Sequence, residues 1–170
     1  MLFITVIVAI FSGILSSTLT PSLTIWSGAL DFNLILLLLF LFYANVSEAS
    51  VFLLVSSIAV AALSGVPLIY VILPGFLLTA LYIFLSDRRI LPPRPTVSLS
   101  ILLFFLASIF VSAVKVLLFK SYSTSVIVPT IMSAVLTAFV GSIIYYFCNR
   151  VFNRLNPQVK RQKIKISRFN

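Results

Sequence analysis

Ala61-Ala62-Leu63-Ser64-Gly65-Val66-Pro67-Leu68 is the sharpest break within the apolar first half of the chain. Glycine weakens a helix, and proline lacks an N–H group and clashes with the preceding turn, so a helix cannot comfortably continue through this stretch. Residues 51–63 and 68–85 are therefore predicted to form the two arms of a tight hairpin. Because a full membrane crossing needs about 20 residues, the arms form either two short crossings, which we favour, or a re-entrant hairpin.

The composition of the whole chain is that of a membrane protein. Of its 170 residues, 61% are hydrophobic and only 9% are charged, whereas a soluble domain carries roughly a quarter charged residues. The first apolar run lacks the basic start of a signal peptide, so we expect it to be a retained helix. The pattern predicts an all-α integral membrane protein with six transmembrane helices over residues 1–148 and a basic cytoplasmic tail over 149–170. The six apolar runs lie at 2–17, 32–43, 51–63, 68–85, 97–119 and 126–147.

Basic residues determine the predicted orientation. The loop that carries Arg88, Arg89 and Arg94 and the tail at 149–170 together hold all twelve lysines and arginines except Lys115 and Lys120. Two predicted crossings separate the loop from the tail, so both lie on one side, and positive charge marks the cytoplasmic side. Both termini are therefore predicted to be cytoplasmic. A re-entrant hairpin would leave four crossings with the same orientation.

The inventory of reactive side chains argues against an enzyme. The chain has no histidine and one cysteine, and its three acidic residues, Asp31, Glu48 and Asp87, are far apart in sequence. General acid–base catalysis and metal binding both need several such groups in one place. We expect no catalytic residue, metal site or cofactor. The net charge of +9 is concentrated in the tail, which favours an anionic membrane surface over nucleic acid as its partner.

Polar residues near the ends of the apolar runs are candidates for structural roles. Asp31 precedes the run at 32–43 and is predicted to cap that helix. Ser47 is a candidate cap for the next helix. Lys115 lies four residues before the end of its run. Lys115 either extends along the helix to the membrane interface or lines a polar interior with Ser108 and Ser112, which precede it by two turns and one turn.

Two further segments have a distinctive composition. Residues 51–63 are rich in serine and alanine, which let helices approach closely in lipid, so this helix is predicted to lie in the interior. The basic tail either anchors the protein to anionic lipid or binds a cytoplasmic partner.

Three patterns resemble the bacterial rod shape-determining MreD family. The first is an acidic residue, Asp31, before a leucine-rich second helix. The second is the turn Leu63-Ser64-Gly65-Val66-Pro67-Leu68, which is similar to the family's Leu-Ser-Gly-x-Pro-Leu. The third is the pair Arg88-Arg89 at the end of the fourth helix. The chain departs from the family at Ala61, where an aspartate is usual. That departure suggests that the turn has an architectural role and no chemical one.

The resemblance implies a non-enzymatic scaffold of the cell-elongation complex in the bacterial inner membrane, linking a cytoskeletal filament to peptidoglycan synthesis and maintaining cell shape. It implies a fold similar to the substrate-binding subunits of energy-coupling-factor transporters, and as partners membrane lipid, MreC, MreB and the wall synthases. The candidate structural or interaction residues are Asp31, Ser64, Gly65, Pro67, Arg88, Arg89 and Lys115. The alternative function is a substrate-binding membrane subunit of a vitamin importer, which would need a polar pocket.

Overall fold

The computed structural model describes residues 2–18, 24–25, 28–88, 90–92, 95–119 and 127–155. These residues are almost entirely helical, which confirms the predicted all-α class. A two-residue antiparallel strand pair between the first two helices was not predicted. The elements are α1 (Leu2–Thr18), β1 (Thr24–Ile25), β2 (Gly28–Ala29), α2 (Phe32–Tyr43), α3 (Val46–Ser64), α4 (Leu68–Asp87), α5 (Val97–Phe119) and α6 (Ile127–Leu155).

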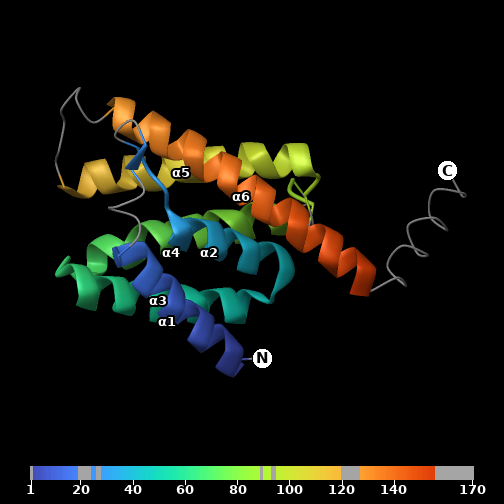
Figure 1. The fold of residues 1–170 in the computed structure, drawn as a ribbon, viewed down its shortest axis with the longest axis horizontal. Coiled ribbons are helices and arrows are strands. Elements are labelled where there is room, and N and C mark those ends of the chain that lie inside the picture. The colour runs from blue at the N-terminus through green and yellow to red at the C-terminus, as the bar shows by residue number, and fades with distance from the viewer. Residues whose placement is uncertain are drawn as a thin grey trace, which may run out of the picture.

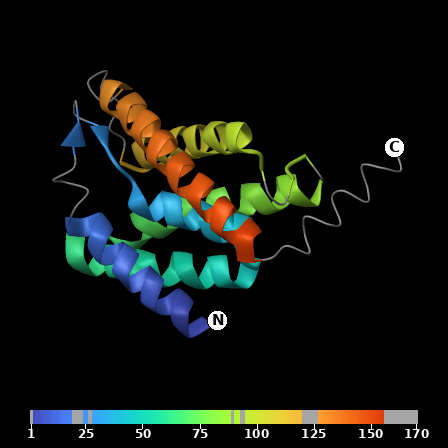
Figure 2. The ribbon, with the colours of Figure 1, turned by 45° about the vertical axis from the view of Figure 1, so that its right-hand side comes forward.

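The helices form one bundle around α2 (Figure 1). α1 packs along α3, α5 packs along α6, and α4 joins the two pairs, while α2 contacts each of the other five helices. The start of α1, the α4–α5 connection and the end of α6 lie at one end of the bundle. The strand pair and the α3–α4 turn lie at the other, as both views show (Figures 1 and 2).

The interior of the bundle is built on α2. Seven of the twelve residues of α2 are buried, and none of the large apolar residues that are exposed in the described chain belongs to it. The serine- and alanine-rich helix α3 was predicted to be an interior, packed helix. It packs closely against α1, but its predicted interior position is wrong, because Leu54, Ile58 and Leu63 are exposed on its outer face. The physical reason is composition: α2 is apolar on all sides, and a helix that is hydrophobic all round is best placed centrally.

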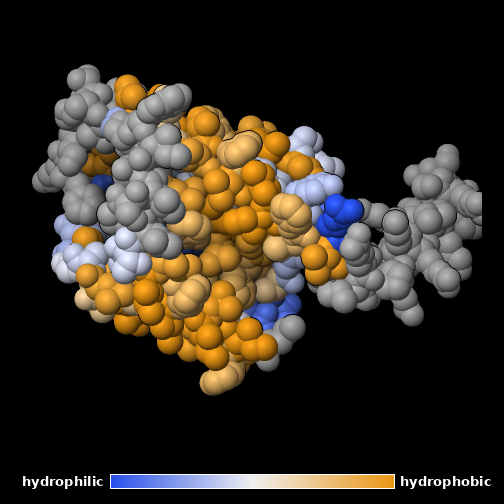
Figure 3. All heavy atoms as spheres, in the orientation of Figure 1, coloured by the Kyte–Doolittle hydropathy of each residue, from blue (hydrophilic) through white to orange (hydrophobic). Residues whose placement is uncertain are grey.

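Apolar side chains cover most of the face shown in Figure 3. Each of the five outer helices exposes large hydrophobic residues, such as Phe3, Leu54, Phe76, Leu106 and Phe139. Apolar surface on this scale would be unfavourable in water but is the normal outer surface of a protein in lipid. In the described part of the chain, α3, α4, α5 and α6 are long and apolar enough to cross a membrane. The chain is therefore a helical membrane protein.

The two remaining helices are shorter. α1 has 17 residues and α2 has 12, and a helix of 12 residues is about 18 Å long, against a hydrocarbon core of about 30 Å. Six crossings therefore stay a prediction. The hairpin arms are longer than expected because α3 begins at Val46, after the cap residue Asn45. Ser47 lies inside α3, so its predicted capping role is wrong, and α3 and α4 each have the length of a complete crossing.

The α3–α4 turn has the predicted tight geometry. Gly65 ends α3 in the left-handed conformation, with φ of 69°, and its N–H donates to the carbonyl of Ala61. A Cβ atom at Gly65 would meet nothing within 4 Å, so the backbone angle and not space calls for glycine here. The Ser64 hydroxyl donates to the carbonyl of Val60, and Pro67 occupies the cap position at the start of α4.

An aromatic cluster stabilises the opposite end of the bundle. Tyr145 of α6 is completely buried, and its hydroxyl donates to the backbone carbonyl of Pro95 in the α4–α5 connection. Its ring packs against Phe42 and Tyr43 at the end of α2. Phe42 also contacts Phe104 of α5 and Tyr82 of α4. The cluster thus ties the connection to four helices.

Candidate functional site: a polar cavity at one end of the bundle

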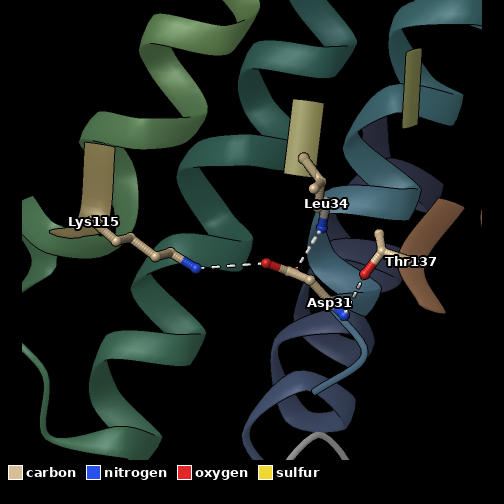
Figure 4. A network of polar contacts seen from close by, with 4 residues as sticks. All are labelled: Asp31, Leu34, Lys115 and Thr137. Atoms are coloured by element: carbon tan, nitrogen blue, oxygen red, sulfur yellow. Dashed lines mark hydrogen bonds and ion pairs between the residues drawn. The ribbon is translucent and has the colours of Figure 1, made fainter. Parts of the chain in front are cut away.

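Asp31 caps α2, as predicted. One carboxylate oxygen accepts a hydrogen bond of 3.0 Å from the N–H of Leu34. The backbone N–H of Asp31 donates in turn to the hydroxyl of Thr137, a completely buried residue of α6, at 3.3 Å (Figure 4). Asp31 is therefore fixed both to its own helix and to α6, which goes beyond the capping role expected from the sequence.

The second carboxylate oxygen of Asp31 faces Lys115 of α5. The Lys115 ammonium lies 3.5 Å from Asp31 Oδ2, and the two side chains are 44% and 27% exposed respectively. Figure 4 shows the lysine side chain extended toward Asp31 between the helices. Of the two alternatives for Lys115, this direction favours the polar interior over extension to the interface.

These two residues lie on the wall of a cavity of about 400 Å³. All six helices contribute to it, and polar and apolar side chains share the lining. Ser108 and Ser112 lie on the wall with Lys115, as the alternative that places Lys115 in a polar interior predicts. The polar residues are Ser16, Asp31, Asn33, Ser64, Tyr70, Ser108, Ser112, Lys115 and Ser133, and the others are Leu34, Leu37, Leu53, Val60, Val66, Val71, Pro74, Gly75 and Val111.

The shortness of α2 explains why there is a cavity. Asp31 contacts Thr137, which lies well inside α6 because that helix begins at Ile127. At 1.5 Å per residue, Thr137 is roughly 15 Å along α6. α2 therefore begins inside the bundle, and its longer neighbours extend past its first residue. Strand β2 continues from that residue along α6, and the cavity lies between the helices, with the Lys115 side chain on its wall.

The structure divides the predicted candidate residues between the two ends of the bundle. Asp31, Ser64 and Lys115 line the cavity, with Gly65 and Pro67 in the adjoining turn. Arg88 is exposed near the other end, where its guanidinium lies 5.0 Å from the centre of the Phe84 ring. Arg89 and residues 156–170 of the predicted tail lie outside the described residues, while α6 continues past residue 148 to Leu155.

Several site residues were not found from the sequence. Ser16, Ser133 and Thr137 lie in apolar runs where a single hydroxyl carries little information. A signal for the ion pair was present, because the predicted topology places Asp31 and Lys115, of opposite charge, at the same membrane face. A further polar link between helices, from the hydroxyl of Ser12 to the side chain of Asn33 at 3.3 Å, had no such signal.

The cavity is suited to binding. Within the described chain no group of three His, Cys, Asp or Glu side chains comes together, and both oxygens of Asp31 already have partners. The lining offers the Lys115 ammonium, the Asp31 carboxylate, the Asn33 amide, several hydroxyls and an apolar wall. Such a lining can hold a molecule by hydrogen bonds and charge while burying its apolar part.

Substitution of Asp31 separates its two roles. An asparagine side chain can still cap α2, so Asp31→Asn is expected to change the free energy of unfolding by less than about 1 kcal/mol, given the partial exposure of the ion pair. Asp31→Ala also loses the cap and is expected to cost about 1 kcal/mol more. Unfolding of the purified protein in detergent, followed by circular dichroism, measures both. Equal losses for the two variants would contradict the capping role.

The fold and the cavity together define a class: a helical membrane protein with a half-open cavity that polar and apolar side chains of all six described helices line. Comparison with protein-family models, with characterised proteins and with solved structures finds no match to the chain.

Proposed function

We propose that this protein is a non-enzymatic scaffold of the cell-elongation complex in the bacterial inner membrane, of the MreD type. The observation that supports the proposal most is the convergence of two of the segments that carry the resemblance. Asp31 and the Leu63–Leu68 turn are more than thirty residues apart in sequence, yet Asp31, Ser64 and Val66 line one cavity. Motifs that act together in a family are expected to lie together in the fold, so this proximity supports the proposal.

The proposal gives each end of the bundle a partner. In the proposed orientation, with six crossings and both termini cytoplasmic, Arg88 and the basic residues after α6 face the MreB filament. The cavity end faces the periplasm, where MreC and the wall synthases work. The exposed apolar faces of the outer helices are available to lipid and to the transmembrane segments of these partners.

Depletion of the protein in a rod-shaped bacterial host tests this role. We expect the cells to become round as the protein is lost, because wall synthesis is no longer directed by the filament. Re-expression of the full chain should restore rods. Cells that stay rod-shaped after clean removal of the gene would rule out the scaffold function.

The cavity favours a second candidate function, the substrate-binding subunit of a vitamin importer. Its volume of about 400 Å³ lies within the range of roughly 300–1,000 Å³ typical of small-molecule sites. The two functions differ in their response to supplementation. If the protein is an importer subunit, a vitamin mixture at high concentration should restore the growth of depleted cells. If it is a scaffold, the cells become round in supplemented medium as well.

A further inference from the structure

We propose that the cavity binds an anionic oxygen group, a phosphate or a carboxylate, carried on an apolar body, and that Lys115 is the residue that binds the anion. This inference goes beyond the scaffold role and does not depend on it. It follows from the hydrogen-bonding capacity of the ion pair and from the composition of the cavity wall.

Both carboxylate oxygens of Asp31 already have a partner within the protein, although a carboxylate offers about four acceptor positions in all. Its Oδ1 accepts from the N–H of Leu34, and its Oδ2 faces Lys115. An ammonium group, in contrast, has three N–H donors. Among the described residues Asp31 is the one ion-pair partner of Lys115, and their separation of 3.5 Å exceeds the roughly 2.7–2.9 Å of a strong charge-assisted hydrogen bond. Lys115 therefore has N–H donors that its pairing with Asp31 does not use.

The groups near Lys115 suit an oxygen-rich anion. Ser108 and Ser112 precede it by two turns and one turn on α5 and line the same wall. The hydroxyl of Ser16, also on this wall, is buried and has no hydrogen-bond partner in the described chain. A buried hydroxyl without a partner is costly, and a bound oxygen atom would provide one. The leucine and valine side chains of the wall would cover the apolar part of the ligand.

Other ligand charges fit the cavity less well. A cationic ligand would place a second positive charge beside Lys115 and compete with it for a carboxylate that is already occupied. A neutral ligand would gain no charge-assisted hydrogen bond from the Lys115 ammonium. An anion satisfies the ammonium, and Asp31 then acts as the internal partner that the ligand displaces.

The anion can come from either of two sources, the head group of an anionic lipid or a free amphiphilic acid. To separate them, the full-length protein is stripped of lipid in detergent and titrated with dodecyl phosphate, with dodecanol as the neutral analogue. In a second experiment each protein is incubated with vesicles of phosphatidylglycerol or phosphatidylcholine. Native mass spectrometry then measures which lipid stays bound to wild type and to each variant. The variants are Lys115→Gln, Lys115→Arg and Asp31→Asn, with Arg150→Gln, an exposed charge on α6 away from the cavity, as matched control.

We expect wild type, Lys115→Arg and Arg150→Gln to bind dodecyl phosphate alike. Lys115→Gln should bind it at least about tenfold more weakly, as expected for loss of a charged hydrogen bond. Asp31→Asn should bind it more tightly, because the internal competitor is gone while the cap is kept. Opposite effects of Lys115→Gln and Asp31→Asn indicate a ligand site. If the ion pair only held the fold together, both substitutions would weaken the binding of dodecyl phosphate. If Lys115→Gln does not fold, the test is whether Asp31→Asn binds dodecyl phosphate more tightly than wild type does.

If wild type retains phosphatidylglycerol in preference to phosphatidylcholine and Lys115→Gln loses this preference, the anion is the head group of a lipid. If dodecyl phosphate binding depends on Lys115 but wild type shows no such lipid preference, the ligand is a free amphiphilic acid. The proposal is overturned if dodecanol binds as well as dodecyl phosphate, if Lys115→Gln binds like wild type, or if Asp31→Asn weakens binding.

Discussion

Replacement of Gly13 by leucine is expected to lower the free energy of unfolding by about 3 kcal/mol, since overpacking of a tight contact costs this much. Gly13 lies where α1 comes closest to α3. A Cβ atom on it would lie 2.5 Å from Cβ of Ala59, 3.2 Å from the carbonyl oxygen of Ser56 and 3.4 Å from the nitrogen of Val60. Two of these are backbone atoms and the third is fixed to the backbone, so no side-chain rotation relieves the contact.

The stripe of small residues on α1 strengthens this expectation. Thr5, Ala9 and Gly13 follow one another at four-residue spacing and are all buried, which is the pattern that lets membrane helices pack closely. Thermal unfolding in detergent measures the effect. Ala62→Leu is the matched control, because it adds similar volume on the exposed side of α3. Equal losses for the two variants would show that α1 does not pack on α3 through Gly13.

Replacement of Tyr145 by phenylalanine is expected to cost about 1–3 kcal/mol, because leaving a buried polar group without a partner carries a penalty of this size. The ring and its contacts with Phe42 and Tyr43 are kept, but the carbonyl of Pro95 loses its donor. The same unfolding measurement applies.

The neighbouring residue provides the control for this substitution. Tyr146 is 48% exposed, so Tyr146→Phe removes a hydroxyl one residue away without removing a buried hydrogen bond. Its stability should stay within about 0.5 kcal/mol of wild type. A Tyr145→Phe variant as stable as Tyr146→Phe would mean that the α4–α5 connection is not held by this bond.

Hydropathy was sufficient to predict the existence and order of the six helices but not all of their ends, because α3 and α6 continue through polar residues that bound the apolar runs. The fifth run, at 97–119, matches α5 at both ends, since Pro95 and Lys120 flank it. The hairpin at Gly65 followed from local backbone chemistry. The start of α3 was misplaced because Ser47 and Glu48 suggest a turn, although polar residues are also common in the first turn of a helix.

The cavity could be predicted only in part. The polar face of α5 was found because Ser108, Ser112 and Lys115 share a helical spacing. The ion pair, the bond from Asp31 to Thr137 and the central place of α2 depend on which helices are neighbours, and a single sequence does not contain that information. The strand pair of β1 and β2 has two residues in each strand, too few to show a periodicity.

The central claim, that the cavity end faces outward and the Arg88 end faces the cytoplasm, is tested most directly by cysteine labelling. Cys148, the one cysteine of the chain, is first replaced by serine. Ser64→Cys at the mouth of the cavity and Arg88→Cys at the other end are then made separately. In intact spheroplasts, a membrane-impermeant maleimide should label Ser64→Cys at once and Arg88→Cys only after permeabilisation. Immediate labelling of Arg88→Cys, with Ser64→Cys protected until permeabilisation, would contradict the account.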